Sequence, residues 1–169
     1  SIHYGSNLVL GWSGRRVHDG PGADFVVFEN PFAFGEASVF MDPAIVEVSV
    51  DGDDWIAFPH DYRAADETAY SSRAADWAGF AGLTPVLLNA DTRPVDPFDH
   101  AAAGGDAFDL ATLPDEGLGA RVRTEGFAFV RIRPAPDRDN PDTGARYPRD
   151  PVANGPDIDG VVARYLAAP

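Results

Sequence analysis

The fold class is decided by residues 45–58, which read IVEVSVDGDDWIAF. Within this stretch, Val46, Val48 and Val50 alternate with Glu47 and Ser49. In an extended chain this period of two places the valines on one face and the polar side chains on the other. The Asp-Gly-Asp sequence that follows is typical of a tight turn, and residues 55–58 supply a second apolar strand. The stretch therefore predicts a β-hairpin with one buried face.

Shorter runs of the same kind occur on both sides of this hairpin, at residues 8–10, 25–28, 127–133 and 158–166. In the third run, Arg131 and Arg133 share one face of the expected strand. Glycine and proline separate the runs, and no regular alternation of strands with helices is visible. Such a pattern predicts an all-β fold, an antiparallel β-sandwich or barrel.

Two segments interrupt this rhythm and are expected to be long loop insertions. Residues 60–104 are rich in Ala, Asp and Tyr, with a short helical stretch expected at 73–77. Residues 134–156 are rich in Pro and Asp, and we expect them to be mobile or ordered by a ligand. Because no internal repeat and no linker is visible, residues 1–169 are expected to form a single domain.

Composition argues against several functional classes. The chain has 13 basic and 27 acidic residues, for a formal net charge of −14, and such a surface repels nucleic acids and anionic lipids. With no cysteine, it has no disulfides and no thiolate metal ligands. No apolar run approaches the roughly 18–20 residues that cross a bilayer, so no transmembrane segment is expected.

Several motifs together resemble a family of bacterial cell-surface proteins and lipoproteins with a discoidin-like domain. Residues 20–32, GPGADFVVFENPF, are similar to its "GPGxDFxVFENxF" segment, and residues 46–55, VEVSVDGDDW, to its "VEVSxDGxxW" hairpin. Residues 103–111, AGGDAFDLA, match a third segment, and residues 156–161 stand where the family has a terminal "FDLDAV" strand. The resemblance extends from about residue 6 to residue 166.

This resemblance implies a galactose-binding-like jelly-roll fold and a location outside the cytoplasm, in the periplasm or on the cell surface, with any signal peptide removed. The chain departs from the family where cysteines are expected, after the hairpin and in a "GCAGxTPV" segment. His60 and Phe80 occupy those two positions here. We therefore expect their side chains to be neighbours in place of a lost disulfide.

Acidic residues cluster next to glycines at the expected junctions of loops and strands, which favours calcium, a cation that takes six to eight oxygen ligands. Glu29 shares a strand face with Phe25 and Val27, and a carboxylate below two core positions requires a cation or an arginine as its partner. The alternative is that the aspartates cap turns by binding nearby amides. The candidate metal ligands are Asp24, Glu29, Asn30, Asp106, Asp109, Asp157 and Asp159.

No arrangement in the sequence selects a catalytic site. Gly11-Trp12-Ser13-Gly14 is one residue short of a nucleophile elbow, and the four histidines lack zinc-ligand spacing. The insertion at 137–144 fails the EF-hand spacing, because Pro141 stands where an oxygen ligand belongs. Aromatic residues of the first insertion offer a candidate carbohydrate platform, made of His60, Tyr62, Tyr70 and Trp77.

These observations favour a non-catalytic, calcium-binding recognition module outside the cytoplasm, with a cell-surface glycan or protein as its partner. Two alternatives stay open. One is a structural accessory subunit docked on a larger extracytoplasmic or membrane-associated complex, which an acidic domain with two long loops also fits. The other is a hydrolase whose site the sequence does not reveal.

Overall fold

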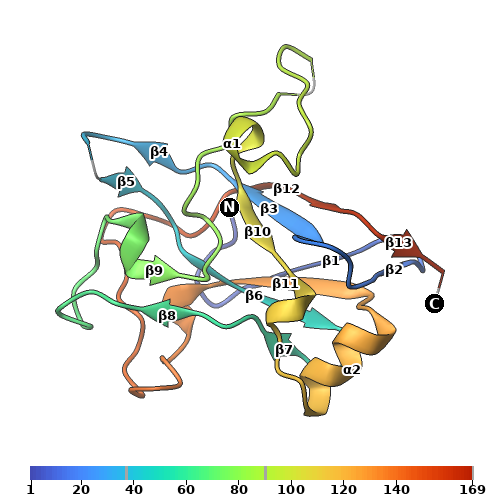
Figure 1. Ribbon diagram of the computed structural model, residues 1–169. Helices are drawn as coiled ribbons and strands as arrows, with labels where there is room; N and C mark the ends of the chain where they lie inside the picture. The colour runs from blue at the N-terminus through green and yellow to red at the C-terminus, as the bar shows by residue number, and fades with distance from the viewer. Residues whose placement is uncertain (37, 90, 169) are drawn as a thin grey trace.

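The computed structural model describes residues 1–36, 38–89 and 91–168, and within them two antiparallel sheets face each other (Figure 1). The larger sheet has the order β1 (Leu8–Gly11), β11 (Phe129–Pro134), β6 (Ala44–Ser49) and β7 (Ile56–Ala57). The smaller has the order β10 (Asp106–Phe108), β3 (Phe25–Glu29) and β12 (Ile158–Ala163). The predicted all-β, antiparallel class is therefore confirmed, whereas the jelly-roll and galactose-binding-like assignments stay predictions.

Shorter elements surround these sheets. Three two-stranded pairs are β2 (Arg16–Val17) with β13 (Leu166–Ala167), β4 (Phe32–Ala33) with β5 (Val39–Phe40), and β8 (Asp61–Tyr62) with β9 (Trp77–Ala78). The helices are α1 (His100–Ala103) and α2 (Gly117–Glu125), with 3-10 turns η1 (Ala74–Asp76), η2 (Leu110–Thr112) and η3 (Ala135–Asp137). None of the helices in the described ranges has the length and apolar content needed to span a bilayer.

The main core fills the space between the two sheets. Fully buried side chains of β6 and β11 meet those of β3 in one cluster that includes Val46, Val48, Ile132, Phe25 and Val27. The Phe25 ring lies at its centre and packs against three other aromatic rings at centroid distances of 5.2–5.5 Å. Phe25 and Val27 thus take the inward positions that the sequence predicts for them.

The predicted hairpin is present, with Val48 of β6 opposite Ile56 of β7. The two arginines of β11 lie on one face as predicted, and both pair with Glu47, at 2.5 Å from Arg131 and 3.6 Å from Arg133. The prediction of a single buried face is wrong, however. Ser49 is fully buried and its hydroxyl accepts the Gly52 amide at 2.8 Å.

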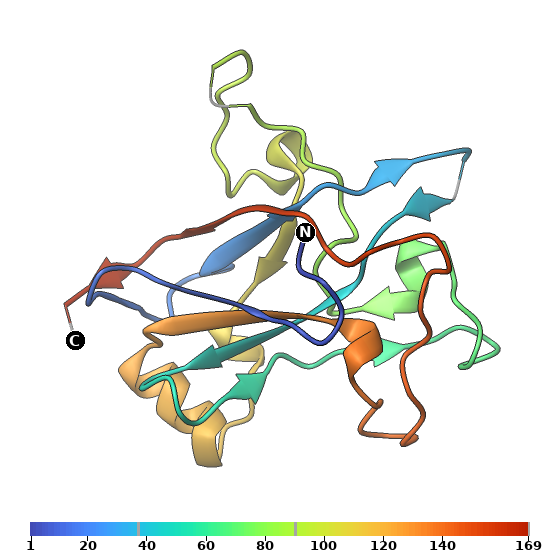
Figure 2. The ribbon, with the colours of Figure 1, turned by 180° about the vertical axis from the view of Figure 1, so that it is seen from behind.

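A second core covers the other face of β6 and is built by the two long insertions. Its buried residues are Met41, Ile45, Tyr62, Trp77, Phe80, Ala135 and Tyr147. The His60 and Phe80 rings lie 5.0 Å apart, which confirms the predicted neighbours, and η1 falls inside the helical stretch expected at 73–77. Because Tyr147 is 2% exposed, the insertion at 134–156 is packed against the sandwich (Figure 2).

The sequence analysis did not predict α2. This helix contains Gly117 and Gly119 among its nine residues, and both weaken an intrinsic helical signal. Gly119 is required by packing, since a Cβ there would lie 2.4 Å from the Pro114 carbonyl oxygen. Only Val122 supplies a large buried side chain, so tertiary packing at the end of the sandwich stabilises a helix that its sequence barely encodes.

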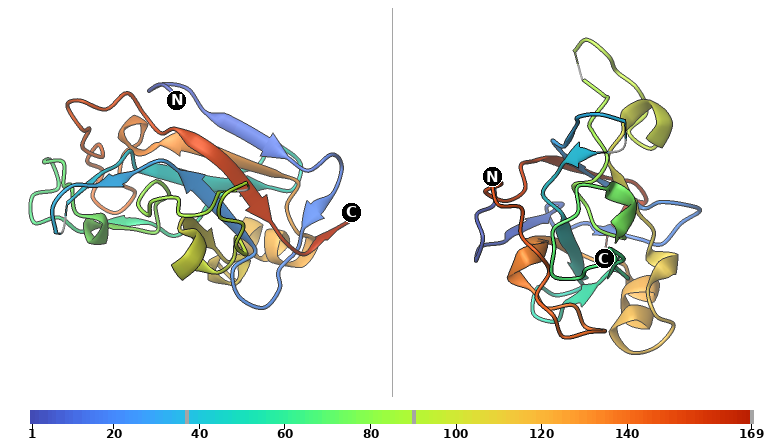
Figure 3. Two further views of the ribbon diagram at one scale, coloured as in Figure 1. Left: turned by 90° about the horizontal axis from the view of Figure 1, so that it is seen from above. Right: turned by 90° about the vertical axis from the view of Figure 1, so that its left-hand side faces the viewer.

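Two segments project beyond the packed layers (Figure 3). One consists of residues 83–89 and 91–99, before α1, and the other is the strand pair β4 and β5. The first packs partly on the outer face of β3, where Val26, Phe28 and Ala103 form a third, smaller cluster. As a result β3 is buried on both faces, and this determines the environment of the acidic residues at its two ends.

The sandwich predicts a sharp difference between the two faces of the larger sheet. Replacing Ile132, which is fully buried, with alanine is expected to lower the free energy of unfolding by about 2–5 kcal/mol. The matched substitution Val9→Ala, on a side chain that is 45% exposed, should change it by less than about 0.5 kcal/mol. Urea denaturation measures both, and equal losses would contradict the burial described.

Candidate functional site

The predicted metal ligands fall into two groups, one at each end of β3. At its start Asp24 lies close to Asp109, which follows β10. At its end Glu29 lies opposite Ile158, next to Asp157 at the start of β12. Asp106 belongs to the second group, because its carboxylate binds the segment that runs past Glu29. Asn30 and Asp159 are exposed and belong to neither group.

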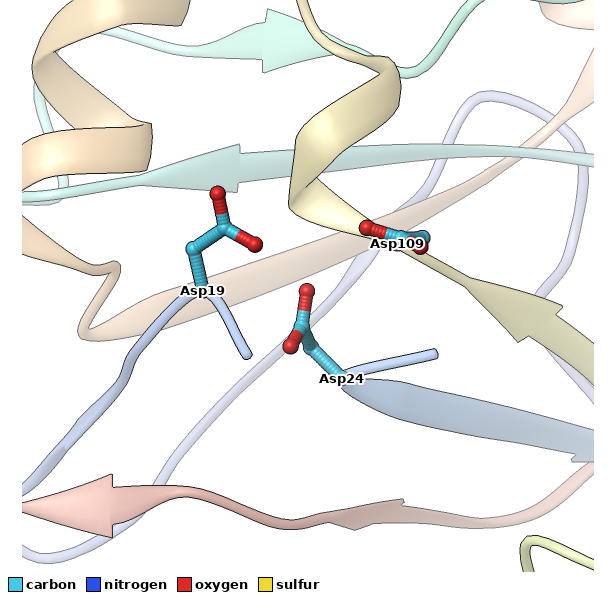
Figure 4. Close-up of side chains that lie close together, drawn as sticks. All are labelled: Asp19, Asp24 and Asp109. Atoms are coloured by element: carbon cyan, nitrogen blue, oxygen red, sulfur yellow. The ribbon is translucent and has the colours of Figure 1, made fainter. Parts of the chain in front are cut away.

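The first group gains a residue that the sequence analysis missed. Asp19, Asp24 and Asp109 each place a carboxylate oxygen within 4.8 Å of the others (Figure 4). Asp24 is fully buried, Asp109 is half-buried, and Asp19 is exposed. The three come from the end of the β2 segment, the start of β3 and the start of η2.

Backbone amides already occupy the buried carboxylate of this group. Asp24 accepts the Gly20 amide at 2.9 Å on Oδ1 and the Leu110 amide at 2.7 Å on Oδ2. Asp109 caps η2 through the Ala111 amide at 2.8 Å. Burial raises the pKa of Asp24 to about 6, the two amides lower it, and the charges of Asp109 and Asp19 raise it. Asp24 and Asp109 therefore cap turns, which is the alternative role that the sequence left open for the aspartates.

The second group is centred on a carboxylate with an unused oxygen. Glu29 is 3% exposed, and its Oε1 accepts the Asp157 amide at 2.8 Å. Its Oε2 is buried and has no hydrogen-bond partner in the described chain. Burial raises the pKa of Glu29 to about 8; the Asp157 amide opposes this, and the negative charges of Asp42, Asp157 and Asp106 add to it.

Asp42, which the sequence analysis also missed, lies beside Glu29. A Cβ built on Gly82 would lie 2.6 Å from the Asp42 carbonyl oxygen and 3.6 Å from Glu29 Oε2. The Gly82 backbone therefore packs closely against the Asp42 carbonyl oxygen, with Glu29 Oε2 as a neighbour on the same side. Burial and the charges of Asp150 and Asp157 together raise the pKa of the Asp42 carboxyl to about 6, against the hydrogen bonds from the Gly155 amide and Tyr4, which lower it.

The segment that passes Glu29 is held to both sheets. Ala81 exchanges two backbone hydrogen bonds with Ala44 of β6, each 2.9 Å long. Two residues later, the Leu83 amide donates a hydrogen bond to the carboxylate of Asp106, in β10, at 2.9 Å. Burial raises the pKa of Asp106, while the Leu83 and Thr84 amides lower it. Glu29 thus lies where β3, β12 and a bridge between the two sheets meet.

A buried carboxylate of this kind needs an arginine, a proton or a metal ion. Among the described residues no arginine forms an ion pair with Glu29. An arginine, one of the two partners that the sequence analysis allowed for Glu29, therefore does not neutralise its charge in the described chain. A proton neutralises Glu29 alone, whereas a divalent cation neutralises Glu29 together with its acidic neighbours and uses the open Oε2.

Two other buried polar atoms in the described ranges lack partners, and neither lies in an acidic group of this kind. They are His18 Nε2 and the Tyr147 hydroxyl. Burying a neutral hydroxyl or imidazole nitrogen without a hydrogen-bond partner costs far less free energy than burying a carboxylate without one, because the carboxylate carries a full charge. Of these three atoms, Glu29 Oε2 is therefore the one for which burial without a partner costs the most free energy.

The aromatic residues proposed for carbohydrate stacking lie mainly in the second core. Trp77 is fully buried and packs against Tyr62, with their ring centroids 4.1 Å apart. Tyr70 is half-buried and donates its hydroxyl to the Met41 carbonyl at 2.7 Å. His60 packs edge-on against Phe80. The buried rings of Trp77 and Tyr62 present no open face to a sugar, so their packing gives the proposed platform no support.

Asp19 and Asp42 had modest sequence signals. Asp19 directly precedes the Gly-Pro-Gly turn, and Asp42 stands in an Asp-Pro pair just before the strong strand of residues 44–49. Both are loop acids next to a strand, the rule that selected the other candidates. Their spatial partners are far away along the chain, and only the fold brings them together.

Comparisons of the chain with protein-family models, with curated proteins and with solved structures found no match. The description of the site therefore rests on its own geometry.

The pKa of Glu29 predicts how stability depends on pH in the metal-free protein. Because the folded pKa is about 8 and the unfolded value is 4.5, the fold loses stability as pH rises between these values. At about 1.4 kcal/mol per pH unit, the loss is on the order of 4 kcal/mol. In Glu29→Gln this part of the loss should disappear, and urea denaturation with chelator from pH 5 to pH 8.5 measures it. A wild-type profile as flat as that of the variant would contradict this account.

Asp24 predicts a different behaviour, because its oxygens are already bound by amides. Asp24→Asn turns one buried acceptor into a donor that faces a backbone amide, and should destabilise the fold by about 1–3 kcal/mol at pH 7.5. The loss should be the same with calcium and with chelator. A loss that appears only in calcium would show instead that Asp24 is a metal ligand.

Proposed function

We propose that this chain is a non-catalytic recognition module that works outside the cytoplasm and whose fold is completed by one calcium ion at Glu29. The observation that supports it is the buried, unpartnered Glu29 Oε2, which lies beside Gly82 on the same side as the Asp42 carbonyl oxygen. The extracytoplasmic location is supported by the sequence resemblance.

The chemistry of the donors favours calcium over other cations. The groups around Glu29 are carboxylates, carbonyls and phenols, all of them oxygen donors, and hard cations prefer these. Calcium accepts six to eight such oxygens, water included, in a flexible geometry, whereas magnesium demands a near-ideal octahedron. A site assembled from loops and strand ends suits the more tolerant ion.

The position of the site favours a structural role for the ion. Glu29 is 3% exposed, which leaves no approach for a substrate. A cation there would hold β3, the residues preceding β6 and the segment at 81–84, elements that belong to both sheets. Binding energy would then appear as folding energy, as is usual for structural metal sites.

A second function, that of an accessory subunit, is favoured by a different feature. On the projecting β4–β5 hairpin, Phe32 and Phe34 are 56% and 51% exposed, and Phe32 stacks on Phe40 at 5.0 Å. Exposed aromatic residues grouped on a protruding hairpin are typical of protein-binding surfaces. Co-purification of a partner with the wild type, and its loss in Phe32→Ser, would favour this alternative.

Calcium is expected to stabilise the wild-type protein at pH 7.5. At 100 times its dissociation constant it adds about 2.7 kcal/mol, which raises Tm by roughly 5–10 °C in a chain of this size. Differential scanning calorimetry in calcium and in chelator measures the shift. The shift should grow with pH between 6 and 8, because the ligand carboxylates must lose their protons first.

Two matched variants locate the ion. Glu29→Gln removes the open carboxylate and should abolish the calcium shift, whereas Asp19→Asn, in the other acidic group, should preserve it. Loss of the shift in Asp19→Asn alone would move the ion to the group at the start of β3. A wild-type Tm unaffected by calcium would overturn the proposal and leave Glu29 neutralised by a proton.

A further inference from the structure

A cavity of about 460 Å³ opens between the N-terminal segment and the insertion at 134–156. Tyr4 and Thr68 line one part of it, and Pro136, Pro148, Arg146 and Arg149 line another. Its volume falls in the range of small-ligand sites, and its walls combine apolar ring faces with a few polar groups. The cavity lies outside the Glu29 site, although Tyr4 reaches toward Asp42 of that site.

The charges of this wall are unusual for so acidic a chain. Two guanidinium groups line the cavity, and the one of Arg149 lies 4.0 Å above the Tyr4 ring. Within the described ranges Arg149 has no carboxylate partner at ion-pair distance. Arg146 pairs with Asp139 through Nε at 2.7 Å and donates from Nη1 to the Pro136 carbonyl oxygen at 3.5 Å, which leaves its Nη2 donors for a ligand.

The acid in the wall is already engaged. Asp137 Oδ2 accepts the Gly5 amide at 2.6 Å, a bond that also holds the N-terminal segment against the insertion (Figure 2). The Tyr4 ring holds the Arg149 guanidinium in place, and this pre-organises a cationic fork at the edge of the cavity. A planar guanidinium without a partner is suited to binding a carboxylate through two parallel hydrogen bonds.

We propose that this cavity binds an anionic sugar residue, a pyranose that carries a carboxylate, through Arg149 and Arg146. The carboxylate would lie on the arginine fork, and the ring would pack on Pro136, Pro148 and the exposed parts of Tyr4. The Thr68 hydroxyl donates to Asp66 Oδ1 at 2.7 Å, and its oxygen offers an acceptor for a sugar hydroxyl. This assigns a ligand class to the recognition function proposed above and rests on it, but it does not require the calcium ion.

The net charge of −14 opposes the approach of any anion, so the local arginines must overcome a repulsive field. Binding should therefore strengthen when moderate salt screens the distant acids, provided that the short contacts with Arg149 persist. A ligand attracted by a general positive surface would show the opposite salt dependence. The change of affinity with salt concentration is therefore a second readout, in addition to the affinity at a single salt concentration.

The test compares glucuronate with glucose, which differ at a single carbon, and with acetate, which has the charge but no ring. Titrations of the wild-type protein followed by NMR chemical shifts should show glucuronate binding at least about tenfold tighter than either. The Arg149→Gln variant should lose glucuronate binding, and the Arg146→Gln variant should lose part of it. Arg93→Gln, an exposed arginine on the segment before α1, should retain it and serves as the control.

Three results would overturn the proposal: equal binding of glucose and glucuronate, equal binding of acetate, or no saturable shifts for any of the three. Glu29→Gln separates this proposal from the calcium site. It should lose the calcium-dependent rise in Tm and still bind glucuronate as the wild type does. Glucuronate binding that survives in Arg149→Gln, in a variant shown by circular dichroism to be folded, would also contradict it.

Discussion

The rest of this structure depends on the Glu29 carboxylate, which the fold buries at the end of its central strand. One oxygen accepts the Asp157 amide and so fixes the start of β12 against the end of β3. The other lies beside Gly82, on the same side as the Asp42 carbonyl oxygen, and has no hydrogen-bond partner in the described chain. Low polarity and three acidic neighbours both penalise the charged form, so the fold at neutral pH requires a counter-charge or a proton. The calcium ion proposed above would supply this counter-charge.

The acidic clusters at the two ends of β3 are similar in composition but differ in their hydrogen bonds. At the start of the strand, Asp24 is buried as Glu29 is, yet backbone amides bind both of its oxygens. Its negative charge therefore organises the turns that precede β3 and begin η2. At the end of the strand only one of four carboxylate lone-pair regions of Glu29 is used by an amide. The number of carboxylate oxygens that backbone amides leave unbound therefore distinguishes the two clusters, and the proposal of a metal ion at Glu29 rests on this difference.

Much of the fold follows from local sequence. Alternation predicts the β6–β7 hairpin, the arginine face of β11 and the inward positions of Phe25 and Val27, because period-two burial is a local property of a strand. The His60–Phe80 contact was expected from the family resemblance. The second core was not predictable, since Tyr147 and Trp77 are brought together by two insertions without periodicity. The same reason explains why Asp42 was missed: it borders Glu29 only because the bridge at 81–84 joins the two sheets.

The central claim is that a calcium ion binds Glu29, and a crystal structure determined in calcium tests it most directly. Data collected at a long wavelength locate the ion by its anomalous scattering. The account predicts a peak 2.3–2.6 Å from Glu29 Oε2, the usual range for calcium–oxygen bonds, with the Asp42 carbonyl oxygen also in its coordination sphere. The account would be contradicted by a peak among Asp19, Asp24 and Asp109. It would also be contradicted by the absence of any peak together with a protonated Glu29 Oε2 that donates a hydrogen bond to a neighbouring oxygen.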